Sequence, residues 1–374
     1  MCLAITICTD SLAWCDKRNL MTNSAWSITH AKLHAFLHRR ILLPKNSRIL
    51  IAVSGGQDSL CLAQLLADLQ RQWQWSLAIA HCDHRWRPDS ADNAAYVETL
   101  AEHWQIPCWI EVAQNSIDSE AAARAWRYET FAKLARQHEY THVVTGHTRS
   151  DRAETVLYNL IRGTGLDGLG TLSWERSLDG HHPSISLVRP LLNVSREETG
   201  QFCQQQNIRP WEDSSNQQLT FRRNRIRLEL LPYLQEHFNP QVERAIAQMA
   251  ETVKMDMQYI EEQAQALYTQ SVTEGVHSNH SISAQNKPDK GRYWEVSQSV
   301  LQSAPAALQN RVIRQLLQKA LAKSPTFREV EKLAALIHAP NRTKSDPFTG
   351  GLIAEVRKPI VVLSSPSSNR PPVK

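Results

Sequence analysis

The sequence of 374 residues lacks any apolar run of the ~18 residues that a membrane-spanning helix requires. It also lacks C-x-x-C pairs, and its seven cysteines have spacings that fit neither a disulfide framework nor a zinc ribbon. The opening residues have no basic segment ahead of their apolar stretch, as a signal peptide would, so we expect a cytoplasmic protein. The formal net charge is only +5, which permits an acidic partner such as nucleic acid without requiring one.

Apolar runs alternate with helix-period segments between residues 47 and 190. The runs that indicate strands are Arg48–Val53, Leu77–His81, Cys108–Val112, Thr141–Thr145 and Leu187–Arg189. The first four begin about 30 residues apart, which is the length of a βα unit. Continuous apolar runs such as ILIAV suit strands that are covered on both faces. We therefore predict an α/β fold, a parallel sheet with flanking helices, over residues 25–222.

A second, mainly helical domain is predicted to follow the first. A linker helix over 223–239 leads to a helical domain over 240–364, which opens with a long helical pattern at Gln241–Tyr268. Residues 271–292 are rich in Ser, Asn, His and Lys, so we expect a polar loop there. Two short β-like runs stand near the end of the domain, at Leu352–Val356 and Ile360–Leu363.

The two ends of the sequence carry no pattern of a folded element. We expect residues 1–24 to form a disordered extension, and both Met1 and Met21 stay open as the start. The tail over 365–374 is rich in Pro and Ser, and we expect it to be disordered as well.

The most informative motif is SGGQDS, from Ser54 to Ser59, between the first predicted strand and a helix. Glycines allow backbone N–H groups to approach an anion, and a helix N-terminus adds the positive end of a dipole. The loop has no Walker A lysine and carries Asp58 instead. Because a carboxylate beside phosphates requires a bridging cation, we expect Asp58 to hold Mg²⁺. An ordinary strand–helix turn, capped by Ser and Asp, is the alternative.

A second motif, GHTRSDRAET, runs from Gly146 to Thr155 and follows the fourth predicted strand. Asp151 and Glu154 lie three residues apart, so they share one face of a helical turn. Two carboxylates at that place suit a divalent cation or an ammonium group. The alternative is that they only favour the helix dipole, as acids do at any helix N-terminus.

These motifs resemble those of a known family. ILIAVSGGQDSLCL is similar to the PP-loop ATP pyrophosphatases, and VVTGHTRSDRAETVLYNLIRGTGLDGL resembles the tRNA(Ile)-lysidine synthetases among them. EAAARAWRYETF, LVRPLL, WEDSSN and RRNRIRLELLP fit the same family, so the resemblance runs in order from about Leu33 to Pro232.

The resemblance implies a reaction in two steps. ATP would adenylate the C2 oxygen of the wobble cytidine in a tRNA(Ile) with a CAU anticodon, releasing diphosphate. The ε-amine of L-lysine would then displace AMP and form lysidine. The tRNA would change from reading AUG and carrying methionine to reading AUA and carrying isoleucine.

The resemblance also implies roles for individual residues. The ATP site would comprise Ser54, Gly55, Gly56, Gln57, Asp58, Ser59, His84 and Gly146. Arg124 or Arg127 would steady the α-phosphate, so the catalytic residues would be Asp58, Arg124 and Asp151. Asp151 and Glu154 would bind the lysine ammonium, with Asp151 helping to deprotonate it.

Four arginines stand close together in RRNRIR, namely Arg222, Arg223, Arg225 and Arg227. A solvated helix end would explain them, but the resemblance favours contact with tRNA phosphates. A regular helix would place Arg223 and Arg227 on one face and Arg222 and Arg225 on another. The sequence leaves the oligomeric state open, with a homodimer among the alternatives.

Other activities remain open at this point. Another PP-loop adenylating enzyme, for tRNA thiolation or for amide ligation of a small molecule, would share the phosphate loop. Thiolating relatives use paired cysteines, which this sequence lacks. An RNA-binding protein with an inactive ATP site is a third alternative, and the presence of Asp58 and Asp151 counts against it.

Overall fold

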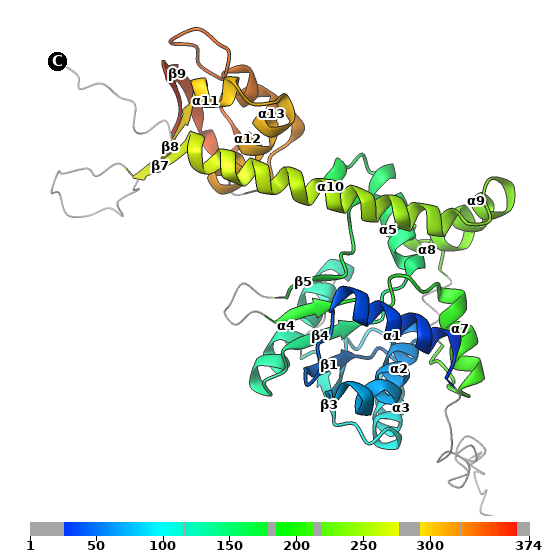
Figure 1. The fold of residues 1–374 in the computed structure, drawn as a ribbon. Helices are drawn as coiled ribbons and strands as arrows, with labels where there is room; N and C mark the ends of the chain where they lie inside the picture. The colour runs from blue at the N-terminus through cyan, green and yellow to red at the C-terminus, as the bar shows by residue number, and fades with distance from the viewer. Residues whose placement is uncertain are drawn as a thin grey trace, which may run out of the picture. The chain divides into compact units, whose positions relative to one another are not determined.

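The computed structural model describes residues 26–114, 117, 119–178, 185–212, 218–276, 292–321 and 323–364 (Figure 1). The chain divides into two compact units, Met1–Glu251 and Thr252–Lys374. The predicted extension 1–24 and tail 365–374 lie outside the described residues. No helix in the described ranges is both long enough and apolar enough to cross a membrane.

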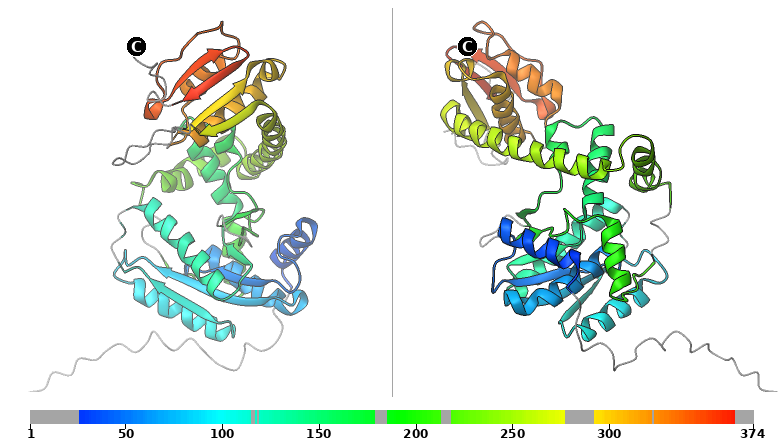
Figure 2. Two further views of the ribbon diagram at one scale, coloured as in Figure 1. Left: turned by 90° about the vertical axis from the view of Figure 1, so that its left-hand side faces the viewer. Right: turned by 45° about the vertical axis from the view of Figure 1, so that its right-hand side comes forward.

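Unit 1 is built on a six-stranded sheet with the order β3-β2-β1-β4-β6-β5 (Figures 1 and 2). The strands are β1 (Arg48–Ala52), β2 (Ser76–Asp83), β3 (Cys108–Val112), β4 (His142–Thr145), β5 (Glu175–Ser177) and β6 (Ser186–Val188). The first four and β6 pair in parallel, which confirms the predicted α/β fold. The short strand β5, antiparallel to β6, was not predicted, because its three residues are exposed and carry no apolar pattern.

Helices cover both faces of this sheet. They are α1 (Ile28–Arg40), α2 (Gln57–Trp73), α3 (Ser90–His103), α4 (Glu120–Gln137), α5 (Arg149–Ile161), α6 (Leu166–Leu169) and α7 (Arg196–Gln205). On β1, Ile49 and Ile51 pack into the core formed with α1, α2 and α7, whereas Leu50 packs with Phe131 and Leu134 of α4. The alternation along a fully buried strand explains why its sequence is continuously apolar.

The strand order reverses between β1 and β4. The chain adds β2 and β3 on one side of β1 and then returns to place β4 on the other side. In open α/β sheets, the crevice at the carboxyl ends of the strands at such a reversal is where ligands bind. The loop after β1 and the loop after β4 both end at this crevice, and these loops carry the SGGQDS and GHTRSDRAET motifs.

Unit 1 extends beyond the domain boundary predicted at residue 222. Three successive helical segments follow, α8 (Arg222–Arg225), the π-helix η2 (Ile226–Leu230) and α9 (Leu231–His237), and then α10 (Val242–Ser271) begins. Ile226 and Leu231 are buried against Ala153 of α5. Glu251 of α10 accepts hydrogen bonds from Arg152 at 2.9 Å and from Trp174 at 2.8 Å. The predicted linker therefore packs on the α/β part of unit 1.

Unit 2 combines helices with an antiparallel sheet in the order β7-β8-β10-β9. Its elements after α10 are β7 (Val272–Val276), β8 (Arg292–Ser297), α11 (Gln298–Gln302), α12 (Ala306–Ala320), α13 (Phe327–Ala335), η3 (Thr349–Gly351), β9 (Ile353–Arg357) and β10 (Ile360–Ser364). The helical prediction and the two β-like runs near the end are confirmed. The polar-loop prediction over 271–292 is wrong at its start, because backbone pairing with β8 makes Val272–Val276 a strand, and residues 277–291 lie outside the described part.

Candidate active site

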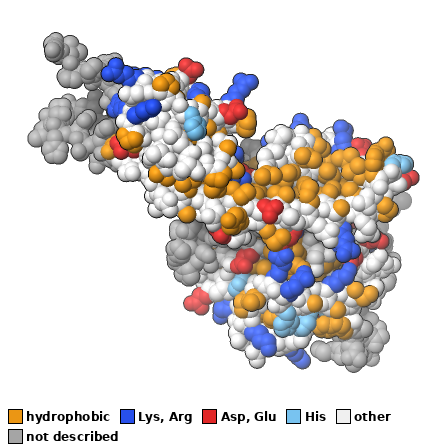
Figure 3. Space-filling view, turned by 45° about the horizontal axis from the view of Figure 1, so that its top comes forward, with side chains coloured by type: hydrophobic (Ala, Val, Ile, Leu, Met, Phe, Trp, Pro, Cys, Tyr) orange, Lys and Arg blue, Asp and Glu red, His pale blue; other side chains and the backbone are white. Residues whose placement is uncertain are grey.

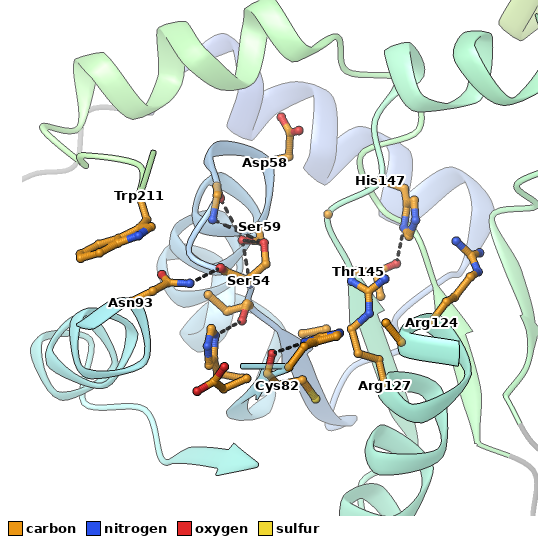
Figure 4. A pocket seen from close by; sticks show the side chains of 18 of the residues that line it. Ser54, Asp58, Ser59, Cys82, Asn93, Arg124, Arg127, Thr145, His147 and Trp211 are labelled. Atoms are coloured by element: carbon orange, nitrogen blue, oxygen red, sulfur yellow. Dashed lines mark hydrogen bonds between the residues drawn. The ribbon is translucent and has the colours of Figure 1, made fainter. Parts of the chain in front are cut away.

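A pocket of about 730 Å³ opens at the crevice between β1 and β4 (Figure 4). The predicted residues that line it are Ser54, Gly56, Gln57, Asp58, Ser59, His84, Arg124, Gly146, Asp151 and Arg227. Gly55 and Glu154 are buried and do not line the pocket, and neither do Arg222, Arg223 and Arg225. The fold therefore brings both motifs and one of the four clustered arginines to one cavity.

The conformation of the SGGQDS loop is held by hydrogen bonds within the loop and by hydrogen bonds with two distant segments. Asn93 of α3 donates its Nδ2 to the carbonyl of Ser54 at 3.0 Å, and the N–H of Trp211 donates to the carbonyl of Gly55 at 2.9 Å. Gly55 has a φ of +85°, and a Cβ there would come within 2.0 Å of Asn93 Oδ1. Only glycine fits this position. The buried Oδ1 of Asn93, a pocket residue, has no hydrogen-bond partner among the described residues.

Asp58, in the first turn of α2, is held by α7. Arg196 Nη1 donates to its Oδ2 at 3.0 Å, and Thr199 Oγ1 donates to its Oδ1 at 2.5 Å. Burial raises the pKa of Asp58, and the Arg196 guanidinium acts against that rise. The Gln57 amide donates to the Arg196 carbonyl at 2.6 Å, so this predicted ATP-site residue turns its amide toward α7.

Sequence reasoning missed Arg196 and Thr199. Arg196 lies 138 residues beyond Asp58, and no local spacing relates the two. The available signal was the segment SREET, two residues after LVRPLL, in which Ser195 caps α7 through a capping box with Glu198. That pattern predicts a helix start near the last parallel strand, where polar residues reach the carboxyl edge of the sheet.

The acid pair on α5 is engaged with Arg227. Asp151 accepts from the N–H and the hydroxyl of Thr148 at 2.8 and 2.9 Å and so closes the cap of α5. Glu154 accepts from Arg227 Nε at 2.6 Å and from Nη2 at 2.8 Å. Burial raises the pKa of Glu154, and the hydrogen bonds from Arg227 oppose the rise. Arg227 thus points into the pocket, whereas Arg223 does not line it and has its Nη1 3.7 Å from Glu120 Oε1.

Arg124, Arg127 and His147 form one wall of the pocket, opposite α7, which we call the arginine wall. Arg124 and Arg127 extend from α4 (Figure 4), and the Arg124 guanidinium lies 5.1 Å from the ring centroid of Tyr128. Burial lowers the pKa of Arg127. It also lowers the pKa of His147 to about 4, so this ring, bonded to Thr145 Oγ1 at 2.9 Å, is neutral at pH 7. The wall therefore presents two guanidinium groups and a neutral imidazole to an anion.

His84 stands at the end of β2. Its Nδ1 lies 3.0 Å from the carbonyl of Cys82, and its ring meets Trp126 edge-on at a centroid distance of 5.0 Å. Burial lowers the pKa of His84, with Arg127 acting in the same direction. A neutral, aromatic-lined corner of this kind suits a flat heterocycle such as adenine.

The pocket offers few ligands to a metal ion. Within the ranges that the structure describes, no group of three or more His, Cys, Asp or Glu side chains is placed to hold one. Asp58 supplies a single carboxylate, of which 13% of the side-chain surface is exposed. One carboxylate combined with substrate phosphates is a usual environment for Mg²⁺, so the residues fit a magnesium ion that arrives with a nucleotide.

The other clustered arginines lie outside the pocket. Arg222 is exposed, Arg225 pairs with Glu229 at 3.5 Å, and Arg223 lies over the Tyr158 ring at 5.7 Å. Large apolar side chains are exposed on the same helices and on α5 and α6, and Figure 3 shows apolar side chains gathered on the face that it presents. The exposed large apolar residues on or next to these helices are Leu160, Ile161, Leu166, Phe221, Leu228, Tyr233 and Phe238.

Comparison with known proteins identifies the family. The sequence profile of the PP-loop domain matches residues 27–234, and that of the TilS substrate binding domain matches residues 297–354. A tRNA(Ile)-lysidine synthase of Nostoc sp. is 51% identical over 90% of this chain and 97% of its own length. The chain belongs to the tRNA(Ile)-lysidine synthase family. A Synechocystis sp. member is 47% identical over 89% of this chain and 96% of its own, and a chloroplastic one of Zygnema circumcarinatum is 36% identical over 82% and 79%.

Membership of the lysidine synthase family confirms the resemblance drawn from the motifs. Among solved structures, a U34-tRNA thiolase of Methanococcus maripaludis superposes with a TM-score of 0.52 over 61% of this chain and 78% of its own, at 17% identity. At that identity the likeness concerns the fold alone.

Proposed function

We propose that this protein uses ATP to ligate L-lysine to C2 of the wobble cytidine in a tRNA(Ile) with a CAU anticodon, forming lysidine. One observation carries the proposal. A single pocket holds the phosphate loop, the arginine wall and the carboxylate of Asp151 on α5, which are groups that adenylation and amine transfer require. The names of the curated relatives supply the substrate, tRNA(Ile).

In the first step the cytidine C2 oxygen bonds to the α-phosphorus of ATP, and the bond to the β-phosphate oxygen breaks to release diphosphate. Ser54, Gly56 and Ser59 would bind the phosphates through the loop and the helix N-terminus. Arg124 or Arg127 would stabilise the charge that develops on the α-phosphate. Mg²⁺, held by Asp58 and the phosphates, would neutralise charge on the leaving group.

In the second step the lysine ε-nitrogen bonds to C2, and the C2–O bond breaks as AMP leaves with the oxygen. A protonated amine is not a nucleophile, so a base must take its proton. Asp151 lines the pocket at the N-terminus of α5 and can hold the ammonium group and then accept the proton. Glu154 would share the ammonium group once Arg227 releases its carboxylate.

The anticodon arm would contact α8 and α9. Exposed Arg222 and Arg225 suit backbone phosphates, and exposed aromatic rings such as Phe221 and Tyr233 suit stacking with unpaired bases. These side chains flank the segment that carries Arg227 into the pocket. A wobble base that leaves the anticodon stack could therefore reach the phosphate loop while its neighbours stay on this surface.

Labelling with lysine tests the proposed function. The purified protein is incubated with ATP, radiolabelled lysine and total tRNA, and the labelled RNA is identified by sequencing. We expect label only in tRNA(Ile) with a CAU anticodon. Label in a small molecule, or no transfer of lysine to RNA, would favour another PP-loop ligase.

The order of the steps gives a second test. With ATP and tRNA but no lysine, we expect diphosphate release and an RNA that carries AMP. Diphosphate release that requires lysine but not tRNA would mean that the amino acid is activated, which would contradict the mechanism.

A further inference from the structure

The phosphate loop of this protein contains no cation of its own. Its residues from Ser54 to Ser59 include an acid, Asp58, and no Lys or Arg. The arginines of α4 stand on another wall of the pocket, beside Tyr128 and His147. A nucleoside triphosphate at the loop would bring several negative charges next to Asp58, and the backbone N–H groups alone carry no full charge to balance them.

A guanidinium group that contacts the loop from outside it belongs to Arg196. It pairs with Asp58 at 3.0 Å, lines the pocket and keeps 36% of its side-chain surface exposed. Its backbone is fixed by two further bonds, the one from the Gln57 amide to its carbonyl and one from its N–H to Ser150 Oγ at 3.1 Å. Asp58 retains a second donor, Thr199, which carries no charge.

We infer that Arg196 is a phosphate-binding residue that supplies, from α7, the cation missing from the loop. When a magnesium-bound nucleotide enters, Arg196 exchanges Asp58 for the β- and γ-phosphates and stays bound to the diphosphate product. A guanidinium fork matches two phosphate oxygens, and phosphate oxygens replace the carboxylate oxygen without loss of the charge-assisted hydrogen bond. The inference rests on the proposed ATP-dependent function.

The packing of α7 supports this role. Gly200 lies so close to the loop that a Cβ there would be 3.1 Å from Gln57 Oε1. Thr199 is fully buried and also accepts from the Gln57 amide at 2.9 Å. The first turn of α7 is thus fixed against the loop, and of its charged side chains it is Arg196 that lines the pocket.

Direct binding of three ligands to the full chain tests the inference. Affinities for inorganic pyrophosphate, ATP and AMP, each with Mg²⁺, are measured by calorimetry for the wild type and for Arg196→Gln. We expect pyrophosphate and ATP to bind about 10- to 100-fold more weakly to the variant, the effect of losing a hydrogen bond between charged groups. AMP lacks the β- and γ-phosphates, so its affinity should change less than about two-fold.

Three further variants separate phosphate binding from support of Asp58. Arg196→Lys keeps the charge and should bind pyrophosphate more tightly than Arg196→Gln does. Thr199→Val removes the other donor to Asp58 without changing charge, and Arg71→Gln removes an exposed arginine of α2 far from the pocket lining. Both should keep pyrophosphate affinity within about three-fold of the wild type.

Several outcomes would overturn the inference. They are unchanged pyrophosphate affinity in Arg196→Gln, equal losses in Arg196→Gln and Arg196→Lys, or a loss in Thr199→Val as large as that in Arg196→Gln. Should Arg196→Gln not fold, the comparison of Arg196→Lys with Thr199→Val decides, since only the former should lose pyrophosphate affinity. A wild type that binds pyrophosphate but transfers no lysine to tRNA would contradict the proposed function and leave this inference intact.

Discussion

Gly146, after β4, lies against the backbone of Asp58, so that a Cβ at Gly146 would be 2.8 Å from the Asp58 carbonyl oxygen. It would also lie 2.9 Å from the N–H nitrogen of Ser59. Backbone atoms cannot swing aside as a side chain can. The two loops that form the pocket therefore fit together only because residue 146 has no side chain.

We predict that Gly146→Ala pushes the two loops apart. We expect the free energy of unfolding to fall by about 1–3 kcal/mol, as for overpacking elsewhere. The affinity for ATP should fall by more than this loss of stability alone would cause. Gly165→Ala is the matched control, because a Cβ at Gly165 meets nothing within 4 Å. Urea unfolding and nucleotide titration of both variants provide the measurement, and equal effects at the two glycines would contradict the prediction.

We predict that substitutions of Asp58 and Asp151, the two acids with proposed catalytic roles, block different steps of the reaction. Asp58→Ala should release no diphosphate from ATP and tRNA, because it removes the carboxylate proposed to hold Mg²⁺ beside the nucleotide. Asp151→Asn keeps an oxygen to cap α5 but cannot take a proton, so adenylated tRNA should accumulate and lysine transfer should fall at least about 100-fold. Asp92→Asn, an exposed acid of α3, is the control.

Chromatography of the RNA after reaction distinguishes unmodified, adenylated and lysine-bearing tRNA. Turnover of either variant at the wild-type rate would remove that acid from the mechanism. Accumulation of adenylated tRNA by Asp58→Ala would show that its carboxylate is not needed for the first step.

We predict that Arg222 and Arg225, and not Arg227, govern the salt dependence of tRNA binding. Replacing both with Gln should lower the slope of log affinity against log salt by about two, one for each lost phosphate contact. Arg227→Gln should leave the slope unchanged, because its guanidinium is bonded to Glu154 inside the pocket. Filter binding at several salt concentrations measures the slopes, with Arg71→Gln as the control; a lower slope in Arg227→Gln would return this residue to the RNA surface.

Glu329 of unit 2 gives a prediction that depends on pH. Hydrogen bonds from the backbone of Thr326 and from the Thr349 hydroxyl hold the pKa of Glu329 at about 2, against an ordinary value of 4.5. A lowered pKa contributes stability above the unfolded value that is lost as pH falls through the folded one. Glu329→Gln should therefore cost about 1–3 kcal/mol at pH 7 and less at pH 3.

Urea unfolding of the full chain at these two pH values measures the effect. Glu331→Gln, on the exposed side of the same helix, should change stability little at either pH. A cost for Glu329→Gln that is equal at pH 7 and pH 3 would show that the charge of the carboxylate contributes nothing.

The sequence predicted the parts of the fold that have a local pattern. Strands such as ILIAV are continuously apolar because both faces are buried, and SGGQDS is recognisable because its neighbours in sequence are its neighbours in space. The partners of Asp58 had no such pattern, since Arg196 and Thr199 meet it only after β4 and β6 join the sheet.

Two further differences between the prediction and the structure also arise from contacts between residues that are distant in sequence. The spacing of Arg223 and Arg227 predicts one shared helical face, but Arg227 lines the pocket and pairs with Glu154, whereas Arg223 does not line it. Composition alone could not predict β7, since its pairing with β8 joins it to residues that lie beyond 291 in the sequence.

The charged groups of the site are already paired with one another, Asp58 with Arg196 and Glu154 with Arg227. A charged substrate that binds there gains one ionic contact only by breaking another, so its net affinity is the difference between two comparable energies. An affinity estimated by adding up the contacts of ATP or of lysine would therefore be too high for either substrate alone. When two substrates of opposite charge bind together, each can pair with one residue of an ion pair and can replace the partner that a residue has lost to the other substrate. The two substrates would then bind more tightly together than either does separately.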